Sequence, residues 1–523
     1  MRKVWFAILL ALTMAAQPAS AKTFRWAADG AVVSVDPYAR NETFLLSFLG
    51  NIYEPLVERG RDLKIGPALA TSWTQTTPDT WRFTLRPGVT FQDGSPFTAA
   101  DVLFSLERAR APGSKVAGML ASIREARAPD PLTVEFVTEA PDPILPEEIA
   151  RWYIMSKTWA EANDAQQPAD LGRNEDGFAT DHANGTGPYQ LVSRDPDDKT
   201  VLAPNVRWWG TRDPSVTRAI YRSIPTDATR VTALVSGEVD MIVGVPAPDR
   251  ERLGRAPGLH LVQGPELRTI LLGMDQWRDE LVGSNVKGRN PFKDIRVRRA
   301  FAEAIDEGQI KDSVMRGVAI PTALMVGPGV TGFSPDLNKR PPFDLAEARR
   351  LLAEAGYPSG FELQMDCPVD RYANDEAICT AVVGMLARIG VTVKLATFSR
   401  AKYFLKVLAP RYNTSFYMIG WAPATYDAQE VLINLIATRQ DGRGRFNVGG
   451  YSNRQVDDLI GAIVGALDPD KRRSLIAEAF RIHQEEIGHI PLHQQVLTWA
   501  ARDTIDLVQM PGNEFALRYV RFK

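Results

Sequence analysis

The sequence predicts an α/β fold in which strands and helices alternate along most of the chain. Strand patterns at 220–224 and 239–243 flank a helical pattern at 228–235 that Gly237 ends, and this order favours parallel strands. A second series at 361–419 contains three strand patterns separated by two helical ones. Because the chain has 523 residues, 45% hydrophobic and 24% charged, we expect about three domains of ordinary globular composition.

The first 21 residues have the pattern of a secretory signal peptide. Arg2 and Lys3 form a charged start, residues 4–16 are apolar, and 19–21 supply the small residues of a cleavage site. The apolar run is shorter than the roughly 20 residues of a membrane span, and no cysteine follows the cleavage site. We therefore expect an exported mature chain that begins at Lys22, without a membrane or lipid anchor.

The charge balance argues against a nucleic-acid-binding protein. The formal net charge of the whole chain is -2, and removal of Arg2 and Lys3 with the leader would make the mature chain more negative. The sequence has no run of Lys and Arg. A weakly acidic chain of this kind is a poor partner for phosphate backbones.

The most distinctive stretch runs from Pro67 to Val102. Apolar residues at 81, 83 and 85 alternate with polar ones, Pro-Gly follows at 87–88, and the alternation resumes at 89–91. We therefore expect a hairpin between 81–85 and 89–91. Thr98 and Asp101 have capping-box spacing ahead of an apolar run, which predicts the start of a helix.

Three further segments have an interpretable structure. Gly185 and Gly187 flank Thr186 in G-T-G-P-Y, and glycines there would let the backbone approach another surface closely. They lack the spacing of a phosphate-binding loop. The apolar residues of 296–306 share one helix face, so we expect its arginines to point outward. Asp344 to Glu347 is another capping-box pattern, and Gly356 should end that helix.

These motifs, in this order, resemble the periplasmic solute-binding proteins of peptide-importing ABC transporters, the dipeptide- and oligopeptide-binding proteins of bacterial extracellular solute-binding family 5. The resemblance rests on P-x-L-A-x-S-W at 67–73, T-W-x-F-x-L-R-x-G-V at 80–89, G-T-G-P-Y at 185–189 and N-P-F-x-D at 290–294. It extends over nearly the whole mature chain.

The resemblance implies a two-lobed periplasmic binding protein fold with a hinge and an extra subdomain in the first lobe. The expected boundaries are a signal peptide at 1–21, the first lobe at 22–60, its subdomain at 61–183, the first lobe again at 184–268, the second lobe at 269–488, and a return to the first lobe at 489–523. It also implies a periplasmic monomer without enzymatic activity, cofactor or metal. Such a protein captures a short peptide between its lobes and delivers it to an inner-membrane permease.

Ligands of open parallel sheets lie at the carboxyl ends of the strands, and two segments of the second lobe follow such ends. The first, 368–372, contains Arg371 and Tyr372. A guanidinium can hold a carboxylate by two parallel hydrogen bonds, and in dipeptide-binding relatives an arginine in a similar segment is understood to do so. The alternative is a solvated loop arginine.

The second segment, 420–427, contains Trp421, Tyr426 and Asp427. In the family, a G-W-x-x-D element supplies an aromatic wall and an aspartate for the amino terminus of the peptide. Here the aspartate position is Ala424. Either Asp427 binds the ammonium instead, or the ligand has no free amino terminus there. Trp421 and Tyr426 are candidate walls, although a tryptophan of this kind can equally belong to the core.

Cys367 and Cys379 are the two cysteines of the chain. In an oxidising compartment they could form a disulfide, and closing so short a loop would stabilise the fold by roughly 3 kcal/mol. Two buried free thiols are an equally good interpretation.

Two other functions remain as alternatives. The same fold could bind an opine, a sugar-containing compound, haem or a nickel chelate, as some family members do. A secreted hydrolase is a different class, but the sequence has no G-x-S-x-G, no zincin motif and no cysteine placed with a histidine partner. His483, His489 and His493 lack the spacing of a known metal motif, so we expect no metal site.

Overall fold

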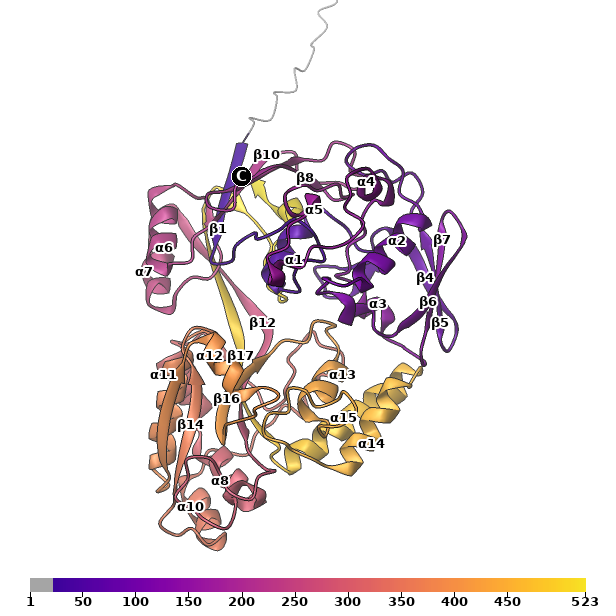
Figure 1. Ribbon diagram of the computed structural model, residues 1–523. Helices are drawn as coiled ribbons and strands as arrows, with labels where there is room; N and C mark the ends of the chain where they lie inside the picture. The colour runs from indigo at the N-terminus through magenta and orange to yellow at the C-terminus, as the bar shows by residue number, and fades with distance from the viewer. Residues whose placement is uncertain (1–21) are drawn as a thin grey trace, which may run out of the picture.

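The structure is a computed structural model that describes residues 22–523, so the expected signal peptide at 1–21 lies outside the described residues. Two lobes are visible, one above the other in Figure 1. The elements of the upper, first lobe are β1 (Lys22–Ala28), α1 (Thr43–Leu49), β2 (Val57–Arg59), β3 (Ile65–Pro67), β8 (Tyr189–Arg194), β9 (Thr200–Pro204), β10 (Val216–Ser223), α6 (Asp227–Ser236), β11 (Met241–Ile242), α7 (Arg250–Gly254), β18 (Ile505–Asp506) and β19 (Arg521–Phe522).

A subdomain of the first lobe is built on its own four-stranded antiparallel sheet, in the order β4-β5-β7-β6. Its elements are β4 (Ala70–Thr77), β5 (Thr80–Leu85), α2 (Ala99–Arg110), β6 (Ile123–Asp130), β7 (Thr133–Thr138), α3 (Leu145–Glu148), α4 (Lys157–Ala162) and α5 (Phe178–Asp181). The capping box of Thr98 and Asp101 is present at the start of α2. That prediction is confirmed.

The expected hairpin between 81–85 and 89–91 is wrong. Strand β5 pairs with β4 across the turn at Pro78-Asp79 and with β7 on its other side. In the segment after Pro87-Gly88, Thr90 makes only an isolated bridge to Pro96. The alternation at 89–91 reflects burial of Val89 and Phe91 in the same core, since a half-buried loop can show the same periodicity as a strand.

The second lobe repeats strands and helices around a parallel sheet. Its elements are α8 (Ile295–Ala304), α9 (Glu307–Gln309), β13 (Ala319–Pro321), α10 (Leu345–Glu354), β14 (Glu362–Pro368), α11 (Asp375–Ala387), β15 (Thr392–Phe398), α12 (Arg400–Val407), β16 (Phe416–Trp421), α13 (Ala428–Val431), α14 (Arg454–Val464) and α15 (Pro469–Glu485). Short 3-10 turns lie at Ala117–Leu120, Leu171–Arg173, Ala247–Asp249, Pro291–Lys293 and Leu517–Tyr519, and π-helical turns at Ile310–Val314 and Leu432–Ile436.

Two long antiparallel strands, β12 (Leu259–Met274) and β17 (His489–Arg502), connect the lobes (Figure 1). They lie in the middle of an eleven-stranded sheet whose path is β15-β14-β16-β12-β17-β11-β1-β10-β9-β8, with β13 paired to β17. One sheet therefore runs from the second lobe into the first. Its register between β12 and β17 shifts between Pro265 and Thr269. A bulge concentrates bending, which makes these residues a suitable hinge.

The parallel arrangement expected for both series is present. Strand β1 pairs in parallel with both β10 and β11, and β14 pairs in parallel with both β15 and β16. Helix α8 buries Val297 and Phe301 as expected, but Arg298 is also buried. Its guanidinium donates to the carbonyls of Phe292 and Glu486, so the expectation that all arginines of this helix point outward is wrong.

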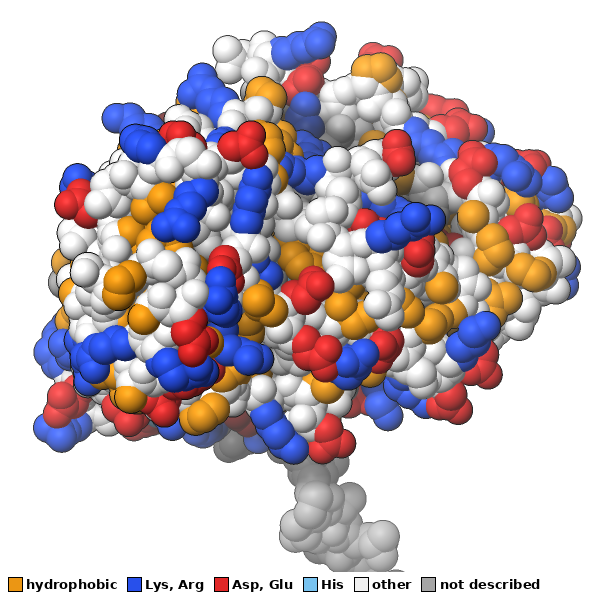
Figure 2. All heavy atoms as spheres, turned by 90° about the horizontal axis from the view of Figure 1, so that it is seen from below, with side chains coloured by type: hydrophobic (Ala, Val, Ile, Leu, Met, Phe, Trp, Pro, Cys, Tyr) orange, Lys and Arg blue, Asp and Glu red, His pale blue; other side chains and the backbone are white. Residues whose placement is uncertain are grey.

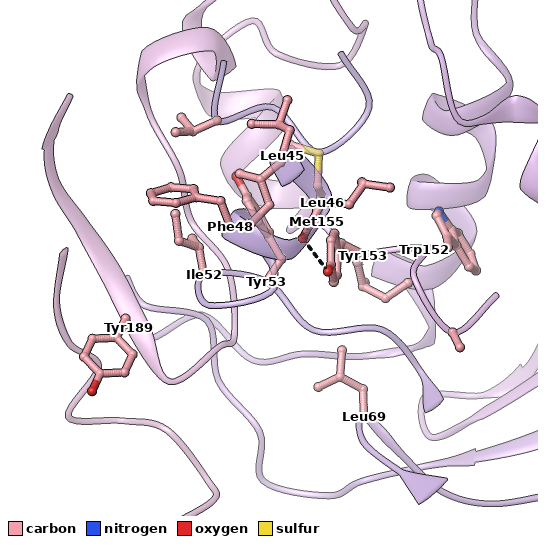
Figure 3. Packing of buried hydrophobic residues seen from close by; sticks show 14 of the residues in the cluster. Leu45, Leu46, Phe48, Ile52, Tyr53, Leu69, Trp152, Tyr153, Met155 and Tyr189 are labelled. Carbon is pink, nitrogen blue, oxygen red and sulfur yellow. Dashed lines mark hydrogen bonds between the residues drawn. The ribbon is translucent and has the colours of Figure 1, made fainter. Parts of the chain in front are cut away.

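The core of the first lobe surrounds helix α1. Figure 3 shows Tyr153 of the subdomain beside Leu46 of this helix, and Phe48 and Trp152 belong to the same buried cluster. The hydroxyl of Tyr153 donates to the carbonyl of Leu46 at 2.7 Å. A Cβ on Gly185 would lie 2.0 Å from the carbonyl oxygen of Ile52, so the expected close approach of this backbone is confirmed.

The two cysteines are bonded to each other, Cys367 at the end of β14 and Cys379 in α11. Replacing both by serine should lower the free energy of unfolding by about 3 kcal/mol, since the open chain gains entropy in the unfolded state. Chemical denaturation with and without reductant measures this. A wild-type protein whose stability does not change when reductant is added would contradict the expectation.

The three histidines near the end of the second lobe are buried and do not form a metal site. His483 Nε2 lies 3.0 Å from His489 Nδ1, and neither ring nitrogen of His493 has a hydrogen-bond partner among the described residues. No group of three or more His, Cys, Asp and Glu side chains within 22–523 is placed to hold a metal ion. Within the same range, no helix is long and apolar enough to cross a membrane.

Burial lowers the pKa of His493 to about 4, whereas an unfolded histidine titrates near 6.5. Below pH 6.5 the unfolded chain therefore binds a proton that the folded chain does not, and stability is lost as the pH falls from 6.5 to 4. The loss should approach about 3 kcal/mol for this group. His493→Phe should not show this pH-dependent loss of stability. In urea denaturation at pH 7 and pH 4.5, the free energy of unfolding should therefore decrease less for the variant than for wild type.

Candidate ligand-binding site

The two segments expected to carry the site meet at one edge of the second lobe. Strands β14 and β16 are parallel neighbours, so the loops after them lie together. The hydroxyl of Tyr372 lies 3.4 Å from the carbonyl of Gly420. A Cβ on Gly420 would lie 2.8 Å from the Tyr372 ring and 3.2 Å from Arg268. A glycine is therefore needed for these two side chains to pack over the strand.

Arg371 is half-buried and its guanidinium has no ion-pair or hydrogen-bond partner among the described residues. Its backbone N–H donates to Asp375 Oδ2 at 2.9 Å, which fixes the loop. Burial, with a contribution from the nearby cations Arg268 and Arg400, lowers the pKa of Arg371. An arginine still carries its charge under all physiological conditions. The charge is therefore available to an anion from outside the chain.

Arg268, which the sequence motifs did not indicate, stands beside Arg371 but is occupied. Its Nε donates to Glu266 Oε1 at 3.2 Å, and Glu266 Oε2 accepts from Gln495 at 2.7 Å. All three belong to the crossing strands β12 and β17. Arg371 therefore lies close to the crossing strands of the hinge.

The two candidate aromatic residues occupy different surroundings. Trp421 is half-buried against Phe446, with 4.7 Å between ring centroids, and its buried indole N–H has no partner among the described residues. Tyr426 is buried, and the guanidinium of Arg59 from the first lobe lies 4.0 Å from its ring centroid. A Cβ on Gly512 would lie 1.9 Å from the Tyr426 hydroxyl. Tyr426 thus reaches across from the second lobe to the first.

Asp427 is engaged within the second lobe. Its two carboxylate oxygens each lie 2.7 Å from a nitrogen of Arg472, and one of them also accepts from the backbone N–H of Gln429 at 2.8 Å. Both side chains are almost completely buried. This arrangement does not favour Asp427 as the acceptor for a ligand ammonium, because both oxygens already have partners. Its partner, 45 residues away along the chain, could not be identified from a motif.

The first lobe contributes a charged wall opposite these loops. Arg59 donates to the carbonyl of Thr425 in the second lobe, and Arg151 forms an ion pair with Glu514 at 2.8 Å. A hollow of about 80 Å³ adjoins them, lined also by Met510. Neither Arg59 nor Arg151 belongs to a sequence motif. Arg59 is distinguished by its contact with the second lobe and Arg151 by its ion pair with Glu514.

One face of the molecule carries side chains of both charges. On the face of the molecule shown in Figure 2, Lys and Arg side chains are interspersed with Asp and Glu. Interspersed charges are typical of a soluble surface and not of a nucleic-acid-binding face.

Two α/β lobes joined by the crossing strands β12 and β17 define a solute-binding protein of the two-lobed class. The chain belongs to the bacterial extracellular solute-binding proteins, family 5, whose middle-region model matches residues 64–443. It is thus the substrate-binding component of an ABC importer.

Relatives agree with this assignment over the full length. The chain is 28% identical over 519 residues to the glutathione-binding protein GsiB of Salmonella typhimurium, with 96% of each chain covered. Among solved structures, HbpA2 from Haemophilus parasuis has a TM-score of 0.82 at 24% identity, covering 96% of this chain and all of that one. The ABC transporter-associated periplasmic binding protein DppA from Helicobacter pylori, in complex with the peptide STSA, has a TM-score of 0.74 at 23% identity, covering 96% of this chain and 98% of that one.

Proposed function

We propose that this protein captures a short peptide between its lobes and anchors a carboxylate of that peptide on Arg371. The observation that supports this best is the half-buried guanidinium of Arg371, which has no partner within residues 22–523 and lies near the hinge between the lobes. The protein is exported through the signal peptide at 1–21 to the periplasm. There it acts as a monomer, without catalysis, and delivers its ligand to an inner-membrane permease.

Closure of the lobes supplies the mechanism. Contacts that come from both lobes exist only in the closed form, so a ligand that makes them shifts the population toward closure. Arg371 and Tyr372 would hold the carboxylate from the second lobe, with Trp421 as an aromatic wall. Tyr426 would act mainly at the junction of the lobes, since Arg59 already covers its ring. The permease would then recognise the closed form.

Asp427 has a supporting role in this proposal. Its ion pair with Arg472 joins the start of α13 to α15, so it holds the 420–427 loop in place without touching the ligand. The boundaries expected from the sequence for the lobes remain part of the same proposal, with the hinge in β12 and β17.

Glutathione is a second candidate ligand, favoured by a specific departure from the family. Ala424 is exposed where an aspartate for the peptide amino terminus would stand, and Asp427 is already paired. In a γ-glutamyl peptide the chain continues through the side-chain carboxyl of the first residue, so the ammonium lies two methylene groups further from the first peptide bond than in an ordinary peptide. The relative from Salmonella typhimurium is named for glutathione.

A thermal-shift panel on refolded, ligand-free protein tests the proposal. We expect short peptides or glutathione at about 100 times the dissociation constant to add about 2.7 kcal/mol to the free energy of unfolding. Opines, oligosaccharides, haem and nickel chelates are the comparison pools. A shift with one of these pools and none with any peptide would show that the ligand is a different solute.

A further inference from the structure

The carboxylates at the junction between the lobes are almost all engaged. Glu430 Oε2 accepts from the backbone N–H and the hydroxyl of Thr425 at 3.0 and 3.1 Å. Glu514 is paired with Arg151 at 2.8 Å, and Asp427 has the ion pair described above. A ligand cation would have to displace one of these partners to bind there.

Glu147 is different. It lies in the short helix α3 of the subdomain and is half-buried. Its carboxylate accepts from its own backbone N–H, but in the part of the chain that the structure describes it has no ion pair within 4 Å and no hydrogen bond from another residue. Figure 1 shows α3 at the lower margin of the first lobe, above α13 of the second.

The charges around Glu147 come from both lobes. Arg59 is the cation of its own lobe that acts on it, and Asp427 and Arg472 are the charged groups of the second lobe that do so. The last two neutralise each other in their ion pair, and the guanidinium of Arg59 is committed to Thr425 and the Tyr426 ring. Thr425 and the Tyr426 ring carry no charge, so Arg59 still acts on Glu147 from a distance, but the carboxylate has no ion-pair partner in contact with it among the described residues.

The pKa of the Glu147 carboxyl agrees with the lack of an ion-pair partner in contact with it within residues 22–523. Burial raises the pKa of its carboxyl to about 7, although Arg59 lowers it. A carboxylate with a close cationic partner would titrate well below its ordinary value. Taking a charge out of water without pairing it is costly, so a cation that arrives here gains a partner that the folded chain does not supply.

We propose that Glu147 receives a positively charged group of the ligand, such as a peptide ammonium, from the side of the first lobe. The inference rests on the proposed function and makes it more specific. The ligand is zwitterionic, with its anionic group on Arg371 of the second lobe and its cationic group on Glu147 of the first. Each lobe thus holds one charge, and both contacts form together only when the lobes close.

Two pairs of probes test the proposal by isothermal calorimetry. They are glutathione with N-acetylglutathione, and trialanine with N-acetyltrialanine, each titrated into wild type, Glu147→Gln and Glu161→Gln. The second variant is the matched control, because Glu161 is an exposed glutamate of the same subdomain. Glutamine keeps the size of the side chain and removes only its charge.

We expect acetylation of the bound probe to weaken wild-type affinity at least tenfold, the scale of one charge-assisted hydrogen bond. Glu147→Gln should bind the free-amine probe at least tenfold more weakly than wild type does, and acetylation of the probe should weaken its binding to this variant little further. Glu161→Gln should bind each probe with the affinity of wild type. Wild-type affinity of Glu147→Gln for the free-amine probe would overturn the inference. The proposed function would stand in that case, provided Arg371→Ala still weakened binding. Tighter binding of the acetylated probes than of the free-amine probes by wild type would also overturn the inference. If wild type bound none of the four probes, both the inference and the proposed function would be rejected.

Discussion

Replacing Arg472 by alanine is expected to lower the free energy of unfolding by about 3–5 kcal/mol, the cost of leaving one member of a buried ion pair without its partner. Asp427 would keep its contact with the backbone N–H of Gln429 but lose two charge-assisted hydrogen bonds in a site without solvent. Urea denaturation followed by circular dichroism measures the loss.

Arg473→Ala provides the matched control for this experiment. Arg473 is the next residue of α15, is exposed and pairs with the exposed Asp470, so its removal should change stability by less than about 1 kcal/mol. The double variant Asp427→Ala, Arg472→Ala should lose less than the sum of the two single losses, because no buried charge is left alone. Equal stability of Arg472→Ala and Arg473→Ala would show that the ion pair does not hold the 420–427 loop.

Arg371→Ala is expected to weaken binding of an anionic peptide more than about tenfold with little change in stability. The guanidinium has no partner to lose within the described chain, so the effect should fall on the ligand and not on the fold. Calorimetry with the best probe of the thermal-shift panel measures it. Arg371→Lys should recover only part of the affinity, because lysine cannot form two parallel hydrogen bonds.

Arg400→Ala is the control for Arg371. It removes an exposed cation from the same surroundings, and should leave affinity within about threefold of wild type, as expected for a screened surface charge. If Arg371→Ala and Arg400→Ala bound the probe equally well, Arg371 would act only as a solvated loop residue.

Local patterns predicted much of the fold. The capping box at Thr98 and the parallel strand series depend on neighbours in sequence, and both are present in the structure. The hairpin at 81–91 was wrong because β5 pairs with β4 on one side and, on the other, with β7, about 50 residues later in the chain. Pairing of distant strands depends on the whole subdomain, which a short window of sequence does not contain.

The candidate site, like the fold, could be predicted from the sequence only in part. Arg371 and Tyr372 followed from the position of a loop after a parallel strand, and the structure brings that loop to the 420–427 segment. The partners of the site could not be predicted, because they are fixed by tertiary contact alone. Arg59 reaches Thr425 across 366 residues of sequence, and Glu147 is distinguished only by the absence of a partner around it.

The central claim, that a ligand is held between two lobes that close on it, can be tested by a distance measurement. No free cysteine is present in residues 22–523, so exposed cysteines introduced at Thr74 of the subdomain and Leu467 of the second lobe can be spin-labelled selectively. Addition of the best-binding probe should shorten the distance between the labels in wild type and leave it unchanged in Arg371→Ala. Calorimetric binding without any change in this distance would mean that one lobe holds the ligand alone, and would contradict the account.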